Sequence, residues 1–290
     1  MLQTEISGKI SYSVPPNERM EDVLTCYILS MFRYINNLEL PMIFLNESVN
    51  ILGHRLDLKE IHSAKIFFWP WVTSMGGGAR QPDALIILKQ LNGYIIAILV
   101  EAKYEAGLSN IPGKNIYDGN KYKKGKQEDI TKYRHQLADE YCGIKCGKWA
   151  ISLQQEIPTD ARKYILYITG NYEIPRQDIE ETINKIRRHK CWMINSECAP
   201  NPENDIFWVS WRNLYSIIYR SHNDFLLNYS EGEWNYIKDL KEILSLRGLK
   251  DFYAFDQYIS CKEYQRFFTL KIWNILNPIE KYYSFYNKQK

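Results

Sequence analysis

The alternation of apolar and polar residues divides the chain into segments of helical and strand periodicity. Apolar residues recur every three or four positions from about residue 18 to 37, directly after the helix-start signal Pro15-Pro16-Asn17. This pattern predicts an amphipathic first helix. Residues 42–72 have a mixed, strand-leaning pattern in which AKIFFWPWV is the clearest strand. The GGGARQP segment that follows predicts a flexible approach to the next strands.

Two short apolar runs follow in RQPDALIILKQLNGYIIAILVEAKY, which spans residues 80–104. Both runs are too short and too rich in Ile, Leu and Val to be separate helices, and the Asn-Gly pair at 92–93 is a strong hairpin signal. The sequence therefore predicts two antiparallel strands. Asp83 stands at the start of the first strand, and Glu101 and Lys103 stand at the end of the second.

The register of this hairpin decides whether its charged residues meet. Successive side chains of a strand alternate faces, so Glu101 and Lys103 share a face. Asn-Gly suits two connections: a two-residue turn sets Asp83 opposite Ala102, whereas a bulged three-residue loop over 91–93 sets Asp83 opposite Glu101. Chemistry distinguishes them, because facing carboxylates repel each other unless a cation lies between them. We expect the three-residue loop.

A pair of opposed carboxylates beside a lysine suits a divalent cation. Mg²⁺ binds one or two protein carboxylates and keeps several waters that a substrate phosphate can displace. Lys103, next along the same face, would then reach the metal-bound water or the phosphate. The alternative is a pair of ordinary charged strand ends, with Lys103 simply paired to a carboxylate.

After a polar loop, the chain alternates between helix and strand and then becomes helical from residue 213. We therefore predict an α/β core over residues 1–211 and a helical C-terminal extension over residues 212–290 that packs on the core. The predicted elements between the loop and the extension are a helix at 126–144, a strand at 163–169, a helix at 176–189 and a strand at 205–211.

Composition adds few constraints. The 290 residues are 45% hydrophobic, which is enough for a sizeable core, and the net charge of +3 means that any preference for a polyanion must come from local patches. No apolar stretch reaches the roughly 18 residues of a membrane span, and the N-terminus lacks a signal-peptide core, so we expect a cytoplasmic protein.

The cysteines and histidines predict no metal site. The six cysteines lack paired zinc-type spacing and are expected to be reduced and unpaired, and the five histidines form no ligand cluster in the sequence. Cys142 and Cys146 would share a helix face, but Gly143 and Gly147 argue against a regular helix there.

Pro82-Asp83 at the start of one strand and Glu101-Ala102-Lys103 at the end of the next resemble the signature of the PD-(D/E)XK nuclease superfamily. In that family, which has the restriction-endonuclease-like fold, a helix precedes a three-stranded meander, and a helix and a fourth strand follow. The αβββαβ order of residues 17–170 is similar. The resemblance implies a central mixed sheet flanked by helices, and Mg²⁺-dependent hydrolysis of DNA phosphodiester bonds, with Mn²⁺ as a substitute.

The resemblance also implies a role for each residue of the motif. Asp83 and Glu101 would be metal ligands, and the carbonyl group of Ala102 would add another. Lys103 would orient or activate the attacking water and stabilise the developing negative charge.

Two further positions follow from the resemblance. Many members add an acidic residue from the first helix, where Glu18 and Glu21 are available. Glu21 is expected, because similar members carry a segment like its EDVLT stretch; the alternative is a carboxylate favoured by the helix dipole. Some relatives carry Gln and Tyr on the helix after the E-x-K strand. Gln136 matches the Gln, as a phosphate contact or a residue behind the metal ligands, but Tyr141 lies one residue beyond the usual spacing.

A basic segment follows the E-x-K strand. Residues 114–134 contain seven basic and three acidic residues with interleaved tyrosines, which predicts a contact with the phosphate backbone of DNA. The alternative is a solvated charged loop. A second basic patch lies at residues 185–190. The expected nucleic-acid-binding residues are Lys121, Lys123, Lys124, Lys126, Tyr133 and Arg134.

These observations lead to two functional hypotheses. The first is a metal-dependent DNA endonuclease, which analogy with the family places in bacterial antiviral defence or in a mobile element. The second is a nucleic-acid-binding or assembly subunit that needs a partner for targeting or activation. The C-terminal extension, which is large and aromatic, would then join a second copy or a partner protein.

Overall fold

A computed structural model gives the fold of the chain. Residues 1–249 form one compact unit and residues 250–290 form a second. In the described ranges, no helix is both long enough and apolar enough to cross a lipid bilayer. The residues that the structure describes are 16–73, 79–104, 136–146, 148–149, 153, 156–188, 200–220 and 229–250.

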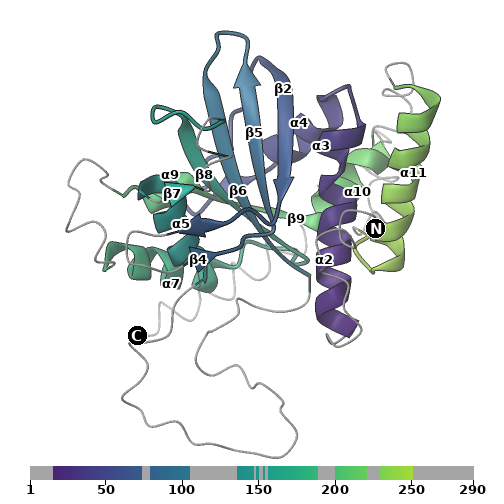
Figure 1. Ribbon diagram of the computed structural model, residues 1–290. Coiled ribbons are helices and arrows are strands. Elements are labelled where there is room, and N and C mark those ends of the chain that lie inside the picture. The colour runs from purple at the N-terminus through teal and green to yellow at the C-terminus, as the bar shows by residue number, and fades with distance from the viewer. Residues whose placement is uncertain are drawn as a thin grey trace, which may run out of the picture. The chain divides into compact units, whose positions relative to one another are not determined.

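A mixed six-stranded sheet with the order β1-β9-β8-β6-β5-β2 lies at the centre of the first unit (Figure 1). Strands β6, β8 and β9 run parallel, and the remaining neighbours are antiparallel. The central strands read as continuous apolar runs because helices cover both of their faces. The strands are β1 (Val49–Asn50), β2 (Ile61–Phe68), β5 (Ala84–Gln90), β6 (Ile95–Lys103), β8 (Arg162–Thr169) and β9 (Ile206–Ser210).

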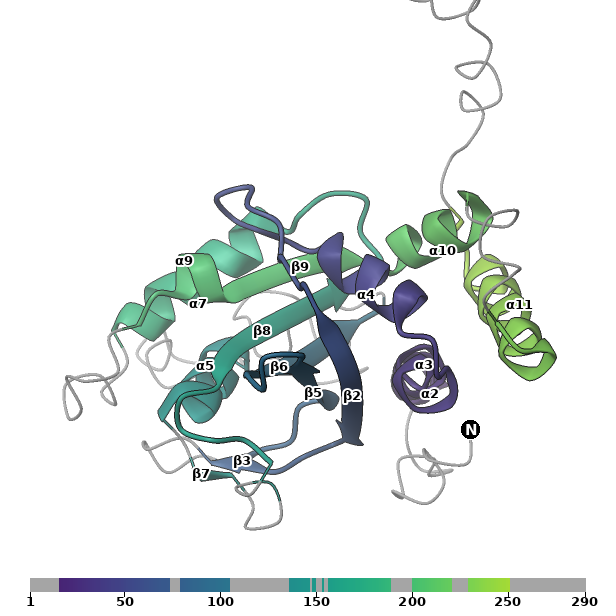
Figure 2. The ribbon, with the colours of Figure 1, turned by 90° about the horizontal axis from the view of Figure 1, so that it is seen from above.

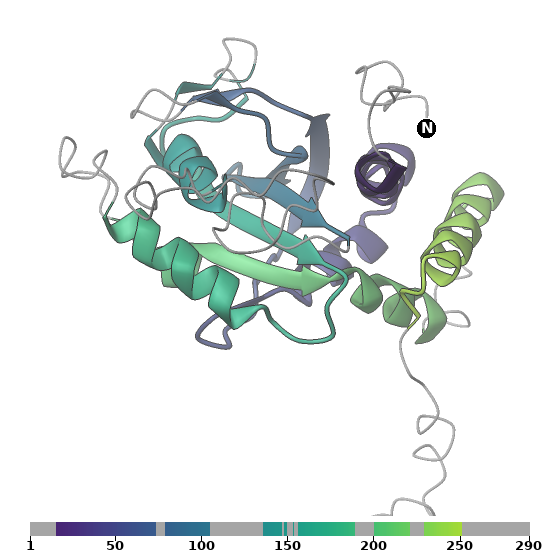
Figure 3. The same ribbon diagram turned by 90° about the horizontal axis from the view of Figure 1, so that it is seen from below.

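Helices lie on opposite sides of this sheet (Figures 1 and 2). On one side α5 (Gln136–Cys146) and α7 (Arg176–Arg187) pack against strand residues that include Leu99 and Tyr167. Figure 3 shows α7 and α11 at opposite ends of the sheet. The other side carries α2 (Pro16–Leu29), α3 (Met31–Tyr34), α4 (Glu39–Asn46), α10 (Trp211–Arg220) and α11 (Glu231–Leu246).

Two smaller features complete the described fold. A short helix, α9 (Pro202–Asp205), precedes β9, and a small sheet beside α5 has the order β4-β3-β7. The strands of this sheet are β3 (Val72–Thr73), β4 (Ala79–Arg80) and β7 (Lys148–Trp149).

The β5–β6 hairpin has the register that sets its charged residues face to face. Lys89 is opposite Ile95 and Ala84 is opposite Val100, so the next step of this register sets Asp83 opposite Glu101. The connection is the three-residue loop 91–93: the N–H of Gln90 donates to the carbonyl of Tyr94 at 2.9 Å, and Gly93 adopts a φ of 87°. The expected three-residue connection is confirmed.

Most of the other predicted elements of the described chain are confirmed. The predicted strands at 163–169 and 205–211 are β8 and β9, and the predicted helix at 176–189 is α7. The first helix is interrupted at Ser30, where α2 ends and α3 begins. The extension is helical where it is described, because α10 and α11 fall in it, and both belong to the same compact unit as the sheet.

Three local predictions are wrong. The first residues of the strand-leaning region 42–72 belong to α4 (Glu39–Asn46), which accommodates Pro41 because a helix's first turn needs no N–H donor there. The strand expected over 64–72 stops at Phe68, because Trp69 adopts a φ of 49° and Pro70 follows it. Helix α5 continues through Gly143 to Cys146.

Gly143 is explained by packing. A Cβ atom at this position would lie 2.3 Å from Cγ1 of Val72, so α5 approaches β3 too closely for any larger residue. Nearby Cys142, like Cys26 in α2, is a buried cysteine.

Candidate active site

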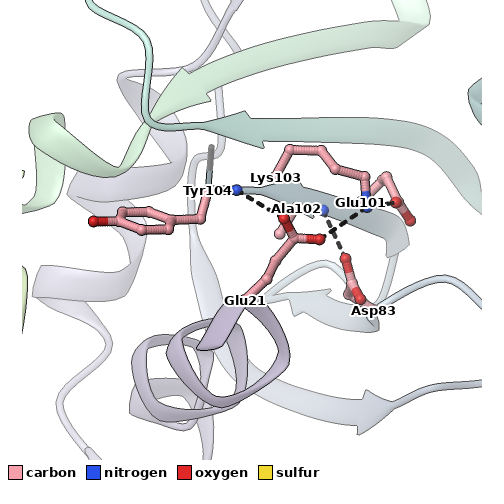
Figure 4. Close-up of polar contacts among 6 residues, drawn as sticks. All are labelled: Glu21, Asp83, Glu101, Ala102, Lys103 and Tyr104. Atoms are coloured by element: carbon pink, nitrogen blue, oxygen red, sulfur yellow. Dashed lines mark hydrogen bonds and ion pairs between the residues drawn. The ribbon is translucent and has the colours of Figure 1, made fainter. Parts of the chain in front are cut away.

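The charged residues of the hairpin gather where β6 ends. Asp83 precedes β5, and its carboxylate accepts a hydrogen bond of 2.7 Å from the backbone N–H of Ala102 (Figure 4). Glu101 and Lys103 lie two residues apart on β6, and the Lys103 ammonium group is 2.6 Å from Oε1 of Glu101. Asp83, Glu101 and Ala102, the expected metal ligands, are therefore adjacent.

The first helix adds Glu21 to this cluster. Its Oε1 atom accepts a hydrogen bond of 3.0 Å from Nζ of Lys103, and its Oε2 atom accepts one of 3.0 Å from the backbone N–H of Tyr104 (Figure 4). Glu21 thus fixes the ammonium group and the end of β6 together. Of the two acidic candidates in the first helix, Glu21 lies at the site, whereas the side chain of Glu18 lies outside the described residues.

The position of the cluster follows from the topology. Lys103 pairs with Thr169 on β8, and Thr169 pairs with Ser210 on β9, so the carboxyl ends of three parallel strands meet here. This edge of an open α/β sheet is where such folds commonly place their ligands. The polar residues therefore interrupt otherwise apolar strands at the end that the fold makes available for binding.

Burial makes the carboxyl groups costly to ionise. Glu101 is 1% exposed and Asp83 is 9% exposed. Burial first, and then the charge of Glu101, raises the pKa of Asp83 well above its ordinary value. Burial likewise raises the pKa of Glu101, although the Lys103 ammonium group opposes this shift. Both groups would be stabilised as carboxylates by additional positive charge.

Lys103 is a cation in this setting. Burial lowers its pKa, but the charges of Glu101, Asp83 and Glu21 together outweigh burial and raise the pKa above its ordinary value. The ammonium group therefore holds its protons throughout the physiological pH range. It can donate hydrogen bonds and stabilise negative charge, but it does not supply a free base.

Sequence reasoning missed one acidic residue of this cluster. Glu140 on α5 is 1% exposed, and burial followed by the charge of Glu101 raises its pKa well above the ordinary value. Both carboxyl groups are buried, and apart from the ion pair of Lys103 with Glu101 neither has a hydrogen-bond partner among the described residues. Leu137 and Ile144, three residues before and four after, are core residues, so an acid on the apolar face of a helix was the available signal.

The other two candidates on this helix lie in different settings. Gln136 begins α5 and is partly buried, one helical turn before Glu140 on the same side of the helix. Tyr141 is directed elsewhere: its hydroxyl group donates to Asp205 at 2.7 Å and accepts from the N–H of Asn201 at 3.1 Å. Tyr141 therefore joins α5 to α9.

An ion pair next to Glu140 orients α5. Arg80 donates from Nε and Nη2 to Oδ2 of Asp139, at 3.0 and 2.8 Å. Arg80 lies only three residues before Asp83. The segment 80–83 therefore supplies a carboxylate of the site and also binds the helix that carries Glu140. The charge pair is partly buried, with 23% and 9% of the two side chains exposed.

Two further predictions concern the basic segments of the chain. The expected nucleic-acid-binding residues Lys121, Lys123, Lys124, Lys126, Tyr133 and Arg134 lie outside the described residues. In the second basic patch, Arg187 forms an ion pair with Glu203.

The donor set suits a hard divalent cation. The carboxylate oxygens of Asp83 and Glu101 are the ligand type that Mg²⁺ prefers, and Mg²⁺ needs only one or two of them. Apart from the Lys103 ion pair, no described residue donates a hydrogen bond to either carboxylate oxygen of Glu101. Within the described ranges, no three His, Cys, Asp or Glu side chains are placed to enclose one ion.

Comparison with family models, with curated proteins and with solved structures gives no match to this chain.

Proposed function

We propose that this protein is a Mg²⁺-dependent DNA endonuclease of the PD-(D/E)XK type. The observation that carries the proposal is the convergence of Asp83, Glu101, Lys103 and Glu21 at the end of β6. The register of the hairpin sets Asp83 directly opposite Glu101. Ordinary charged strand ends would lie in solvent, whereas these residues are largely buried and joined to one another.

The fold supports the same proposal. The described elements include the order α2, β2, β5, β6, α5, β8, which is the αβββαβ order of a restriction-endonuclease-like core. The motif residues occupy the ends of the two hairpin strands, as the resemblance implies. The setting in bacterial defence or a mobile element is proposed by analogy with the family alone.

Asp83 and Glu101 would hold the metal, and the Ala102 carbonyl group would assist. When bound, Mg²⁺ would lower the pKa of a coordinated water and neutralise charge that develops on the phosphate. Asp83 is already oriented by the N–H of Ala102, so little side-chain freedom would be lost on binding.

Lys103 and Glu21 would act on the substrate side of the site. As a cation, Lys103 would donate hydrogen bonds to the attacking water or a non-bridging phosphate oxygen, and would stabilise the extra negative charge of the transition state. Glu21 would set the direction of that ammonium group, since it binds both Lys103 and the next backbone N–H.

Cleavage of plasmid DNA tests this function. Purified protein should cut DNA with Mg²⁺ or Mn²⁺ and not with EDTA, and Asp83→Asn and Lys103→Met should each reduce the rate at least about a hundredfold. Asp160→Asn and Lys65→Met are matched controls, because Asp160 is exposed and Lys65 is paired on β2, away from the site. Equal cutting by wild type and either site variant would refute the proposal.

A second candidate is a subunit that acts with a partner. A cavity of about 260 Å³ between α10 and α11 combines the apolar or aromatic side chains of Tyr215, Ile218, Trp234 and Ile237 with the polar ones of Lys238, Lys241, Glu242 and Ser245. Such a surface suits a protein contact. A chain that is monomeric in solution and cuts DNA without any partner would count against this candidate.

A further inference from the structure

Glu140 occupies a position where an acidic residue needs a reason. It lies in α5 between the core residues Leu137 and Ile144, and its side chain is 1% exposed. Among the described residues, no donor forms a hydrogen bond to either of its carboxylate oxygens. A carboxylate buried in this way is strongly unfavourable, so packing alone does not account for it.

The sheet places this carboxyl group against the proposed metal ligands. Ala97, Leu99 and Glu101 share one face of β6, and the first two pack in the same core as α5. Glu101 therefore faces α5 at the next position along the strand. Besides burial, the charges of Glu101 and Asp83 both raise the pKa of Glu140, and neither Glu101 nor Glu140 has a hydrogen-bond partner in the described ranges apart from the ion pair of Glu101 with Lys103.

The charges of the cluster are not balanced. Glu21, Asp83, Glu101 and Glu140 bring four carboxyl groups together, and Lys103 supplies the one ammonium group that pairs with them among the described residues. Lys103 already contacts Glu21 and Glu101, which leaves Glu140 without a directly bound cation in the described part of the chain. A divalent ion would supply the missing charge in the form that carboxylate oxygens prefer.

We propose that Glu140 is a metal-binding residue, which holds a divalent cation jointly with Glu101. This inference rests on the proposed function, because it extends the same site by a ligand that the E-x-K motif does not contain. The burial of Glu101 and Glu140 on elements that pack together, with no hydrogen-bond donor to Glu140 in the described part of the chain, carries it. Mg²⁺ and Mn²⁺ are the cations that this oxygen donor set would select.

Titration of Mn²⁺ into the full-length protein, followed by calorimetry, tests the inference. Glu140→Gln should weaken Mn²⁺ binding at least about tenfold. The control Glu180→Gln removes a carboxylate from the exposed side of α7 and should bind as wild type does. Wild-type affinity in Glu140→Gln would overturn the inference.

Asp83→Asn separates the two claims. Loss of Mn²⁺ binding in Asp83→Asn with wild-type binding in Glu140→Gln would leave the proposed function standing and refute the role of Glu140. Absence of Mn²⁺ binding in wild type would refute both.

Thermal melting gives a second measurement. Mn²⁺ should raise the melting temperature of wild type more than that of Glu140→Gln, whereas a purely structural role for Glu140 would leave the two shifts equal. If Glu140→Gln fails to fold, Glu140→Asp keeps the charge on a shorter side chain. The inference then expects weaker Mn²⁺ binding by Glu140→Asp, and wild-type affinity would contradict it.

Discussion

Asp83 is a side chain that is oriented for binding at a cost to the stability of the folded protein. Its carboxylate is oriented by the N–H of Ala102 but is buried beside Glu101, and burial is the larger influence on its pKa. Asn would keep an acceptor for the Ala102 N–H and would remove the charge. Residues of this kind commonly trade stability for function.

We predict that Asp83→Asn stabilises the metal-free protein by about 1 kcal/mol at neutral pH. The pKa of Asp83 is raised in the folded state, so its ionised form costs stability at pH values above the folded pKa, and that cost disappears as pH falls towards the unfolded value of 3.8. The gain from Asp83→Asn should therefore shrink with falling pH. Chemical denaturation in EDTA from pH 4 to 8 measures it, and a destabilised variant would contradict the prediction.

The close packing of Val72 against α5 explains why residue 143 is a glycine. Alanine is the better helix former by about 1 kcal/mol, yet a Cβ atom here would meet Val72 at 2.3 Å. We predict that Gly143→Ala destabilises the protein by about 1–3 kcal/mol through overpacking. Urea denaturation should show a smaller loss when Gly143→Ala is made in a Val72→Ala background.

A matched control is available in α11. A Cβ atom added at Gly232 would have no other atom within 4 Å, so Gly232→Ala should leave stability unchanged or slightly increased. A Gly143→Ala variant as stable as wild type would show that β3 can move away from α5.

At the scale of elements, α11 begins with a complete capping box. The Ser230 hydroxyl group accepts from the N–H of Glu233, and the Glu233 carboxylate accepts from the N–H of Ser230 at 2.9 Å. The same carboxylate also accepts from the N–H of Asn36 at 2.6 Å, which joins α11 to the segment between α3 and α4. One side chain therefore fixes a helix end and a tertiary contact.

We predict that Ser230→Ala lowers the free energy of unfolding by about 1 kcal/mol. Hydrogen bonds from Ser230, together with those from Asn36, lower the pKa of Glu233. A depressed carboxyl pKa contributes stability above its unfolded value of 4.5, and that contribution is lost as pH falls through the folded pKa. The stability difference between wild type and Glu233→Gln should therefore shrink below about pH 4.5; a constant difference between pH 3 and 7 would contradict this.

Elements with strong local patterns could be predicted from the sequence. The β5–β6 hairpin follows from two apolar runs around Asn-Gly, and its register was correctly expected on the argument that a cation would lie between Asp83 and Glu101. Helix α4 could not be recognised, because its apolar residues form a continuous run with no helical periodicity. Pro41 also argued against a helix at this position. Glu140 was missed for a related reason: its burial beside β6 depends on how α5 packs on the sheet.

At the scale of the whole molecule, the two C-terminal helices that the structure describes are part of the core. Phe44 of α4 stacks on Trp211 at the start of α10, with 6.3 Å between ring centroids. The hydroxyl group of Tyr236 on α11 donates to the carbonyl of Tyr27 on α2. The Tyr104 hydroxyl group donates to the carbonyl of Arg247, so the end of the site strand also contacts the end of α11.

We therefore predict that the minimal folded unit ends after α11. A chain of residues 1–250 should melt cooperatively, because residues 1–249 form one compact unit. A chain of residues 1–220 loses the Tyr236, Glu233 and Arg247 contacts, which should lower its melting temperature by about 10 °C or more or leave it insoluble, at about 2–4 °C per kcal/mol. Calorimetry of both truncated chains against the full protein checks this. Equal melting of residues 1–220 and the full chain would show that α11 is a separate extension after all. Retention of Mn²⁺ binding by residues 1–250 is also expected, because Glu21, Asp83, Glu101 and Glu140 of the proposed metal site all lie in the first unit.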